Sequence, residues 1–182
     1  GGHDPTGGAG IQADIETVTA LGGRALSLVT ALTAQDSRDV HAIWPTPAAA
    51  FGKQLDTLLG DISPDAIKVG LIASTDLVAV LATHLDGFAG PVIVDPVLAA
   101  GGGFQLAQNE LVAAIRERLL PQTTLITPNR AEARRLAGLE DPDAAASARG
   151  RPSAERPGHL VVTGGTGFSP PGSVARGLRG SA

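Results

Sequence analysis

The sequence predicts an α/β fold with a parallel sheet, and three features support this expectation. Short apolar segments of the kind found in buried strands alternate with longer segments in which apolar residues recur at helical spacing. Glycine or proline stands at most of the junctions between these segments. The 182 residues, of which 43% are hydrophobic and 18% charged, suffice for one folded domain with a sizeable core. We therefore expect strands joined by right-handed helical crossovers.

The first quarter of the chain predicts one helix and two strands. Apolar residues at helical spacing indicate a helix over residues 11–21, which a Gly-Gly pair would end. The near-continuous apolar run at 25–32 indicates a strand covered on both faces of its sheet. A shorter strand is expected at 40–44, where Pro45 ends it.

The same alternation continues through the rest of the chain. Thr46 as N-cap and Pro47 as first helical residue predict a second helix. Ser74 or Thr75 would cap a third. The remaining predicted elements are strands at 66–69, 91–94, 124–127 and 159–163 and helices at 111–119 and 131–137.

The helical and strand pattern weakens toward the C-terminus. Residues 140–158 contain several prolines, which argue against a full helix there. Glycine, proline, serine and arginine dominate from residue 164 onward. We therefore expect an α/β domain over residues 1–165 and an irregular tail over residues 166–182.

Composition excludes several classes of function. The net charge is −4 and the basic residues do not cluster before the tail, which disfavours nucleic-acid binding. The longest apolar run is too short to span a bilayer and no charged-then-apolar leader is present, so we expect a cytoplasmic protein. The absence of cysteine excludes disulfides, thiolate nucleophiles and cysteine zinc sites. The oligomeric state stays open, although unpaired strand edges would favour a homodimer.

The stretch from Gly2 to Asp14 is the strongest candidate for a binding site. It is rich in glycine and leads directly into the first predicted helix, whose unpaired N–H groups and dipole suit a polar or anionic ligand. A phosphate-binding P-loop is excluded because no lysine precedes Lys53. The dinucleotide motif G-x-G-x-x-G would need a preceding strand. An ordinary glycine-rich turn is the alternative.

This stretch resembles the opening of the hydroxymethylpyrimidine kinase / phosphomethylpyrimidine kinase family of thiamine biosynthesis, in the ribokinase-like superfamily. The family pattern G-x-D-[PS]-[ST]-G-G-A-G-I-Q-A-D matches residues 2–14. Further segments resemble the family in the same order: T-A-L-T-A-Q at 30–35, K-V-G-L at 68–71, V-D-P-V at 94–97, T-P-N-R-A-E-A at 127–133 and V-V-T-G-G at 161–165. The resemblance covers residues 2–165 and implies a ribokinase-like parallel sheet flanked by helices in three αβα layers, incomplete at its N- and C-terminal ends.

The resemblance implies an ATP- and Mg²⁺-dependent kinase of 4-amino-5-hydroxymethyl-2-methylpyrimidine and its monophosphate. On the matched positions, Gln35 reads the pyrimidine ring, Asp14 holds the hydroxymethyl group, Gly2 contributes backbone and Val97 lies against the substrate. A glutamine amide suits an aminopyrimidine edge because it offers a donor beside an acceptor. Lys68 is either part of the pocket wall or a partly buried structural lysine.

The resemblance also implies a nucleotide site. Asn129 and Glu132 would position phosphates and a magnesium-bound water, with Glu132 serving the metal, and Thr163 and Gly165 would contact the nucleotide or its phosphates. The spacing of Asn129 and Glu132 equally fits an asparagine N-cap with a capping-box glutamate, so both interpretations stay open.

One departure from the family pattern leaves the catalytic group unassigned. The family carries a Gly-Thr-Gly-Cys anion hole, whereas Gly165-Thr166-Gly167 is followed here by Phe168 and two prolines. We therefore expect a truncated family member with an unknown catalytic base. A non-catalytic remnant that binds pyrimidine without phosphoryl transfer and a related pyridoxal-type vitamin kinase are the alternatives.

Overall fold

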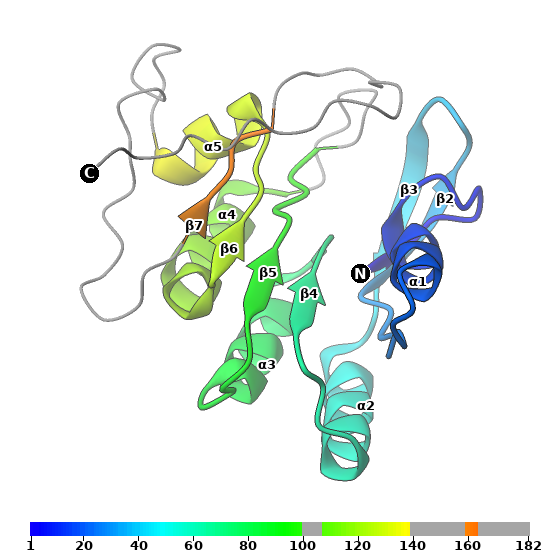
Figure 1. The fold of residues 1–182 in the computed structure, drawn as a ribbon. Helices are drawn as coiled ribbons and strands as arrows, with labels where there is room; N and C mark the ends of the chain where they lie inside the picture. The colour runs from blue at the N-terminus through cyan, green and yellow to red at the C-terminus, as the bar shows by residue number, and fades with distance from the viewer. Residues whose placement is uncertain (100–106, 139–158, 164–182) are drawn as a thin grey trace, which may run out of the picture.

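The computed structural model describes residues 1–99, 107–138 and 159–163, which form two sheets placed side by side (Figure 1). The first sheet has the order β1-β2-β3, with β1 at Gly2–His3, β2 at Ala31–Gln35 and β3 at Val40–Pro45. The second has the order β4-β5-β6-β7 and is parallel throughout. Its strands are Ile67–Val69, Val92–Val94, Leu125–Ile126 and His159–Leu160.

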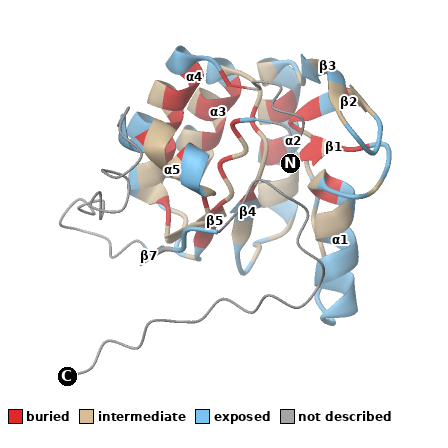
Figure 2. Ribbon diagram, turned by 90° about the horizontal axis from the view of Figure 1, so that it is seen from above, coloured by how far each residue is buried: buried red, intermediate tan, exposed pale blue. Residues whose placement is uncertain are grey.

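The helices match the predicted positions closely. Their bounds are α1 Gly10–Ala20, α2 Ala48–Asp61, α3 Thr75–Leu85, α4 Asn109–Ala114 and α5 Arg130–Ala137. After α4 the chain continues as a π-helical turn, Ile115–Leu119, which completes the helix predicted at 111–119, and then as a 3₁₀ turn, Leu120–Gln122. Figure 2 shows α2, α3 and α4 on one side of the strands and α1 on the other, as expected for an αβα arrangement.

The main core lies between the α2–α3–α4 layer and the second sheet. It includes Phe51 and Leu55 of α2, Leu77 and Leu81 of α3, and Val92 of β5, each exposed by 6% or less. The Ser74 side chain caps α3 by accepting a hydrogen bond from the Leu77 N–H at 3.2 Å, which confirms one of the two predicted caps. Burial of these residues stabilises the packing of α2, α3 and α4 on the second sheet, whose strand ends carry part of the candidate site.

Two predictions for the first half of the chain are wrong. The strand was expected at 25–32, but the strand in this region is β2, which begins only at Ala31 and ends at Gln35. Of the preceding residues, Leu28 packs against the core cluster, and Thr30 donates its hydroxyl to the Leu71 carbonyl. An apolar run reports burial and does not by itself specify strand pairing. β2 is also exposed on one face, since Leu32 retains 54% of its surface.

The first sheet also contains an antiparallel pair, β2 with β3, where a parallel sheet was expected. The four residues between these strands form a tight turn in which the Asp36 carboxylate accepts hydrogen bonds from the Arg38 and Asp39 N–H groups. A parallel connection needs a crossover of a dozen or more residues, so this short link imposes the antiparallel arrangement.

The predicted start of α2 is displaced by one residue. Pro47 occupies the N-cap position and Ala48 begins the helix. Thr46 does not cap it, because its hydroxyl donates to the Val29 carbonyl at 2.7 Å. The threonine therefore ties the segment before β2 to the start of α2.

His84 joins α3 to α2 through both of its ring nitrogens. Nδ1 lies 2.7 Å from the Val80 carbonyl oxygen and Nε2 lies 2.9 Å from an Asp56 carboxylate oxygen. Because both neighbours accept hydrogen bonds, both nitrogens must carry a hydrogen for the two bonds to form. The bond to the Val80 carbonyl, followed by that to Asp56, raises the pKa of His84 above its ordinary value of 6.5.

We predict that this link makes stability depend on pH. A raised folded-state pKa means that the stabilisation is complete below pH 6.5 and is lost as the pH rises through the raised value. The free energy of unfolding, measured with urea from pH 6 to pH 9, should therefore fall more in the native protein than in a His84→Gln variant. Parallel curves for the two proteins would contradict this account.

Candidate functional site

A pocket of about 250 Å³ opens between the two sheets, where the N-terminal loop meets the carboxyl ends of β4 and β5. Parallel strands deliver the residues that follow them to one edge, which is why ligand sites collect there. The lining residues used below are Gly2, His3, Asp4, Gly10, Asp14, Thr33, Gln35, Lys68, Leu71, Asp95 and Val97. All four residues predicted to contact a substrate, Gly2, Asp14, Gln35 and Val97, are thus brought together.

The N-terminal loop is shaped by Asp4, whose role was not foreseen from the sequence. This carboxylate is 5% exposed and accepts hydrogen bonds from the Thr6 N–H and the Thr6 hydroxyl, both at 2.8 Å. Its own carbonyl accepts from the Gly7 N–H at 3.1 Å. An aspartate followed two residues later by threonine is a common turn signal, so the spacing could have identified this role.

Gly10 brings the start of α1 against β1. Its φ is +64°, and a Cβ built on it would lie 2.4 Å from the Gly2 carbonyl oxygen. Only glycine can bring its backbone this close to the Gly2 carbonyl, because any other residue carries a Cβ that would clash with it. The glycine therefore places Gly2 and the first turns of α1, including Asp14, at the same pocket wall.

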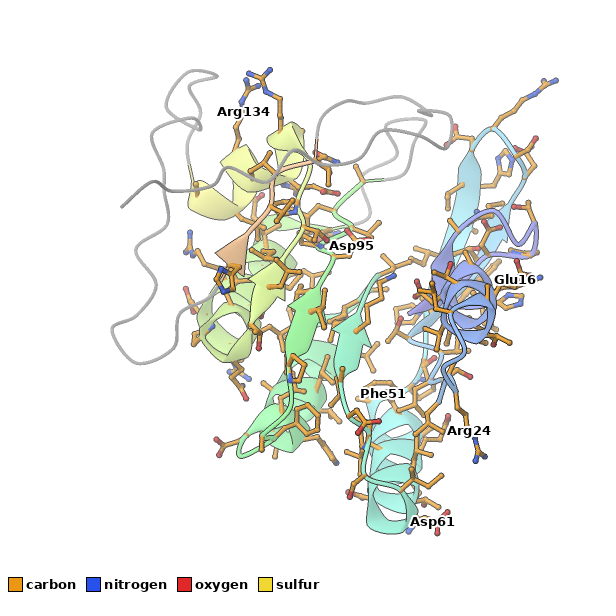
Figure 3. All side chains as sticks on the ribbon, in the orientation of Figure 1. Glu16, Arg24, Phe51, Asp61, Asp95 and Arg134 are labelled. Atoms are coloured by element: carbon orange, nitrogen blue, oxygen red, sulfur yellow. The ribbon has the colours of Figure 1, made fainter. Side chains whose placement is uncertain are left out.

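Lys68 closes the pocket by pairing with Asp14. The lysine extends from β4 and the aspartate from α1, so the ion pair links this helix to the second sheet at the pocket. Asp95 follows β5 at the same edge (Figure 3). Burial raises the pKa of Asp95, the positive charge of Lys68 opposes that shift, and the negative charge of Asp14 adds to it. Of the two interpretations of Lys68, the structure supports the pocket wall.

Gln35 is the last residue of β2, and its amide lies beside the Thr33 hydroxyl, with Oγ1 and Oε1 2.9 Å apart. The pairing of β2 with β3 shifts register between Ala34 and Gln35. Such an irregularity turns a side chain away from the regular direction of its strand. The prediction placed Gln35 just after a strand, whereas β2 itself delivers it to the pocket.

Asn129 and Glu132 form the capping box of α5. The Asn129 side chain accepts from the Glu132 N–H at 3.0 Å, and the Glu132 carboxylate accepts from the Asn129 N–H at 2.8 Å. Glu132 is 7% exposed and also accepts from the Leu98 N–H at 3.3 Å. Burial raises its pKa, and the two backbone hydrogen bonds oppose this shift. The structural interpretation is therefore confirmed, and the metal and phosphate roles stay predictions.

Thr163 lies beside this capping box and Gly165 falls outside the described residues. Thr163 forms an isolated parallel bridge with Asn129, and its N–H donates to the Pro128 carbonyl at 2.9 Å. Within residues 1–99, 107–138 and 159–163, we find no group of three or more His, Cys, Asp or Glu side chains arranged to hold a metal ion. Over the same ranges no helix has the length and apolar character needed to cross a membrane.

Comparison with known proteins identifies the family. The family described as phosphomethylpyrimidine kinase matches residues 4–174. The chain belongs to this family. A hydroxymethylpyrimidine/phosphomethylpyrimidine kinase of Bacillus subtilis is 38% identical over 170 residues, covering 90% of this chain and 62% of that protein.

Solved structures agree with this assignment and with the ribokinase-like fold. The crystal structure of a phosphomethylpyrimidine kinase from Clostridium difficile gives a TM-score of 0.70 at 33% identity, covering 77% of this chain and 61% of the other. A pyridoxal kinase from Staphylococcus aureus in complex with AMP-PCP gives 0.66 at 32% identity, covering 76% and 50%. The chain spans about half the length of several curated relatives that it matches.

We predict that Gly10→Ala will destabilise the protein more than Gly22→Ala. Both glycines have positive φ, but a Cβ at Gly22 meets nothing within 4 Å whereas one at Gly10 meets the Gly2 carbonyl. Gly22→Ala should cost about 1–2 kcal/mol for its conformation alone, and Gly10→Ala should exceed it because the N-terminal loop must also move. Urea unfolding of both variants measures the difference. Equal losses would show that the close approach to Gly2 is unimportant.

Proposed function

We propose that the protein transfers a phosphoryl group from ATP to 4-amino-5-hydroxymethyl-2-methylpyrimidine and to its monophosphate. The observation that carries this proposal is the convergence of the Gln35 amide and the Asp14 carboxylate on one pocket whose wall includes Gly2 and Val97. The amide offers a hydrogen-bond donor and an acceptor to the amino group and ring nitrogen of an aminopyrimidine. The carboxylate accepts a hydrogen bond from the hydroxyl that attacks the phosphoryl group.

The capping box of α5 suits the phosphate side of this reaction. The Glu132 carboxylate accepts two backbone hydrogen bonds, and an ionised carboxylate offers about four acceptor directions, so capacity remains for a magnesium-bound water. Asn129 lies at the N-terminus of the same helix, whose dipole favours anionic phosphates. Bound Mg²⁺ would neutralise charge on the triphosphate. Thr163, bridged to Asn129, and Gly165 complete the proposed nucleotide site.

Gln35 favours the pyrimidine over pyridoxal, the substrate named for several structural neighbours. The motif that ends in Gln35 and the residue 2–14 stretch resemble the pyrimidine kinases, and both meet in the pocket. We also propose a cytoplasmic location, and a homodimer as the assembly because β3 is an edge strand of its sheet.

Two measurements on the same preparation test this function. Isothermal calorimetry with 4-amino-5-hydroxymethyl-2-methylpyrimidine reports binding, and a coupled assay with ATP and Mg²⁺ reports ADP release. We expect both signals. Binding without ADP release would instead support the non-catalytic alternative, which the departure at Phe168 from the family's anion-hole pattern favours. Pyridoxal binding in preference to the pyrimidine would overturn the choice of substrate.

We predict that Gln35→Ala will weaken binding of the pyrimidine by about 1–3 kcal/mol, because ligand groups are left without partners. By the usual conversion this raises the dissociation constant about 5- to 150-fold. Gln54→Ala is the matched control, because Gln54 is an exposed glutamine of α2 and does not line the pocket. Unchanged affinity in Gln35→Ala would remove Gln35 from the site.

A further inference from the structure

The Thr33 hydroxyl lies between two groups that the structure places in the pocket. Its Oγ1 is 2.8 Å from the His3 carbonyl oxygen of β1 and 2.9 Å from the terminal amide of Gln35. Thr33 is only 9% exposed. The 2.9 Å contact places the Thr33 and Gln35 side chains next to each other despite the register shift just before Gln35, and both line the pocket.

The number of hydrogens decides how these three groups are bonded. A hydroxyl carries one hydrogen, so it cannot donate fully both to a carbonyl oxygen and to an amide oxygen. The His3 carbonyl can only accept, and it therefore takes the Thr33 hydrogen. The oxygen and nitrogen of a glutamine amide are similar in size, so the orientation of the amide is assigned from its hydrogen-bond partners. If the amide is turned so that its nitrogen takes the place of Oε1 beside Thr33, each donor in the chain from Gln35 to Thr33 to His3 has one acceptor.

We propose that Thr33 fixes the orientation of the Gln35 amide and thereby makes the pocket select an aminopyrimidine over the corresponding pyrimidinone. This inference rests on the proposed function, in which Gln35 reads the ring. In the fixed orientation, the amide oxygen accepts from the exocyclic amino group and the second amide hydrogen is donated to the adjacent ring nitrogen. Thr33 acts through Gln35, so it is a positioning residue.

A pyrimidinone presents the opposite order along the same edge, with a carbonyl acceptor beside a ring N–H donor. A glutamine that is free to turn by half a rotation matches either edge equally well. Turning it here would leave the Thr33 hydroxyl with two acceptors and one hydrogen, which costs free energy in a buried setting. In the proposed binding mode the ligand cannot turn over to compensate, because Asp14 holds its hydroxymethyl group.

The test compares two ligands on three proteins by calorimetry. The ligands are 4-amino-5-hydroxymethyl-2-methylpyrimidine and its 4-oxo analogue, and the proteins are the native chain, Thr33→Val and Thr33→Ser. The native chain should prefer the amino ligand by at least about tenfold, as expected where a site hydrogen-bonds its ligand in a fixed pattern. Thr33→Val has a similar shape without the hydroxyl, and its preference should fall toward equal affinities. Thr33→Ser retains the hydroxyl and should keep the native preference.

The outcomes separate this inference from the function on which it rests. If Thr33→Val keeps the native preference, binds neither ligand, or loses affinity for both ligands equally, the hydroxyl has another role and the inference is overturned. Loss of the preference in Thr33→Ser would overturn it as well. These results leave the proposed function standing as long as the native chain binds the amino ligand. A native chain that binds neither ligand overturns both.

Discussion

The ion pair between Asp14 of α1 and Lys68 of β4 spans the pocket that lies between the two sheets. Its side chains retain 32% and 41% of their exposure, so its net contribution to folding stability is small, about 0–1 kcal/mol. Other contacts stabilise the arrangement of the first sheet on the core. Leu28 packs on the main core, and the Thr30 hydroxyl donates to the Leu71 carbonyl beside the pocket. The pair therefore matters mainly for geometry, since it fixes the direction of the carboxylate that we expect to receive the substrate hydroxyl.

The segment after β5 connects this pocket to the start of α5. Asp95 and Val97 line the pocket, whereas the next side chain, Leu98, is 1% exposed and belongs to the core. The Leu98 N–H donates to Glu132, the residue that completes the capping box of α5. One short stretch, residues 95–98, thus carries two residues that line the pocket and an N–H group that donates to the capping box of α5. Phosphoryl transfer depends on such positioning of acceptor and donor, more than on covalent chemistry by the protein.

Local side-chain chemistry explains which parts of the fold the sequence could predict. Capping residues gave the start of α3 at Ser74 and of α5 at Asn129, because each cap satisfies helix N–H groups within three residues. Four residues of the pocket, Gly2, Asp14, Gln35 and Val97, were predictable because the resemblance to the family supplied them. The segment at 25–32 was not, since its burial comes from contacts with distant residues and not from strand pairing. The prediction that Thr46 caps α2 was wrong for the same reason, because its hydroxyl donates to the distant Val29 carbonyl.

The proposed selectivity of the pocket for an aminopyrimidine depends on both the sequence and the sheet. A glutamine by itself predicts affinity for an edge that carries a donor and an acceptor, but it does not predict their order, because its amide can turn. A third group must set that order. The T-A-L-T-A-Q segment contains this group, since the Thr33 hydroxyl lies 2.9 Å from the Gln35 amide. Its second partner, the His3 carbonyl, comes from β1, and the parallel pairing of β1 with β2 brings it there. The sequence therefore names the two side chains, and the sheet supplies the backbone oxygen that fixes their direction.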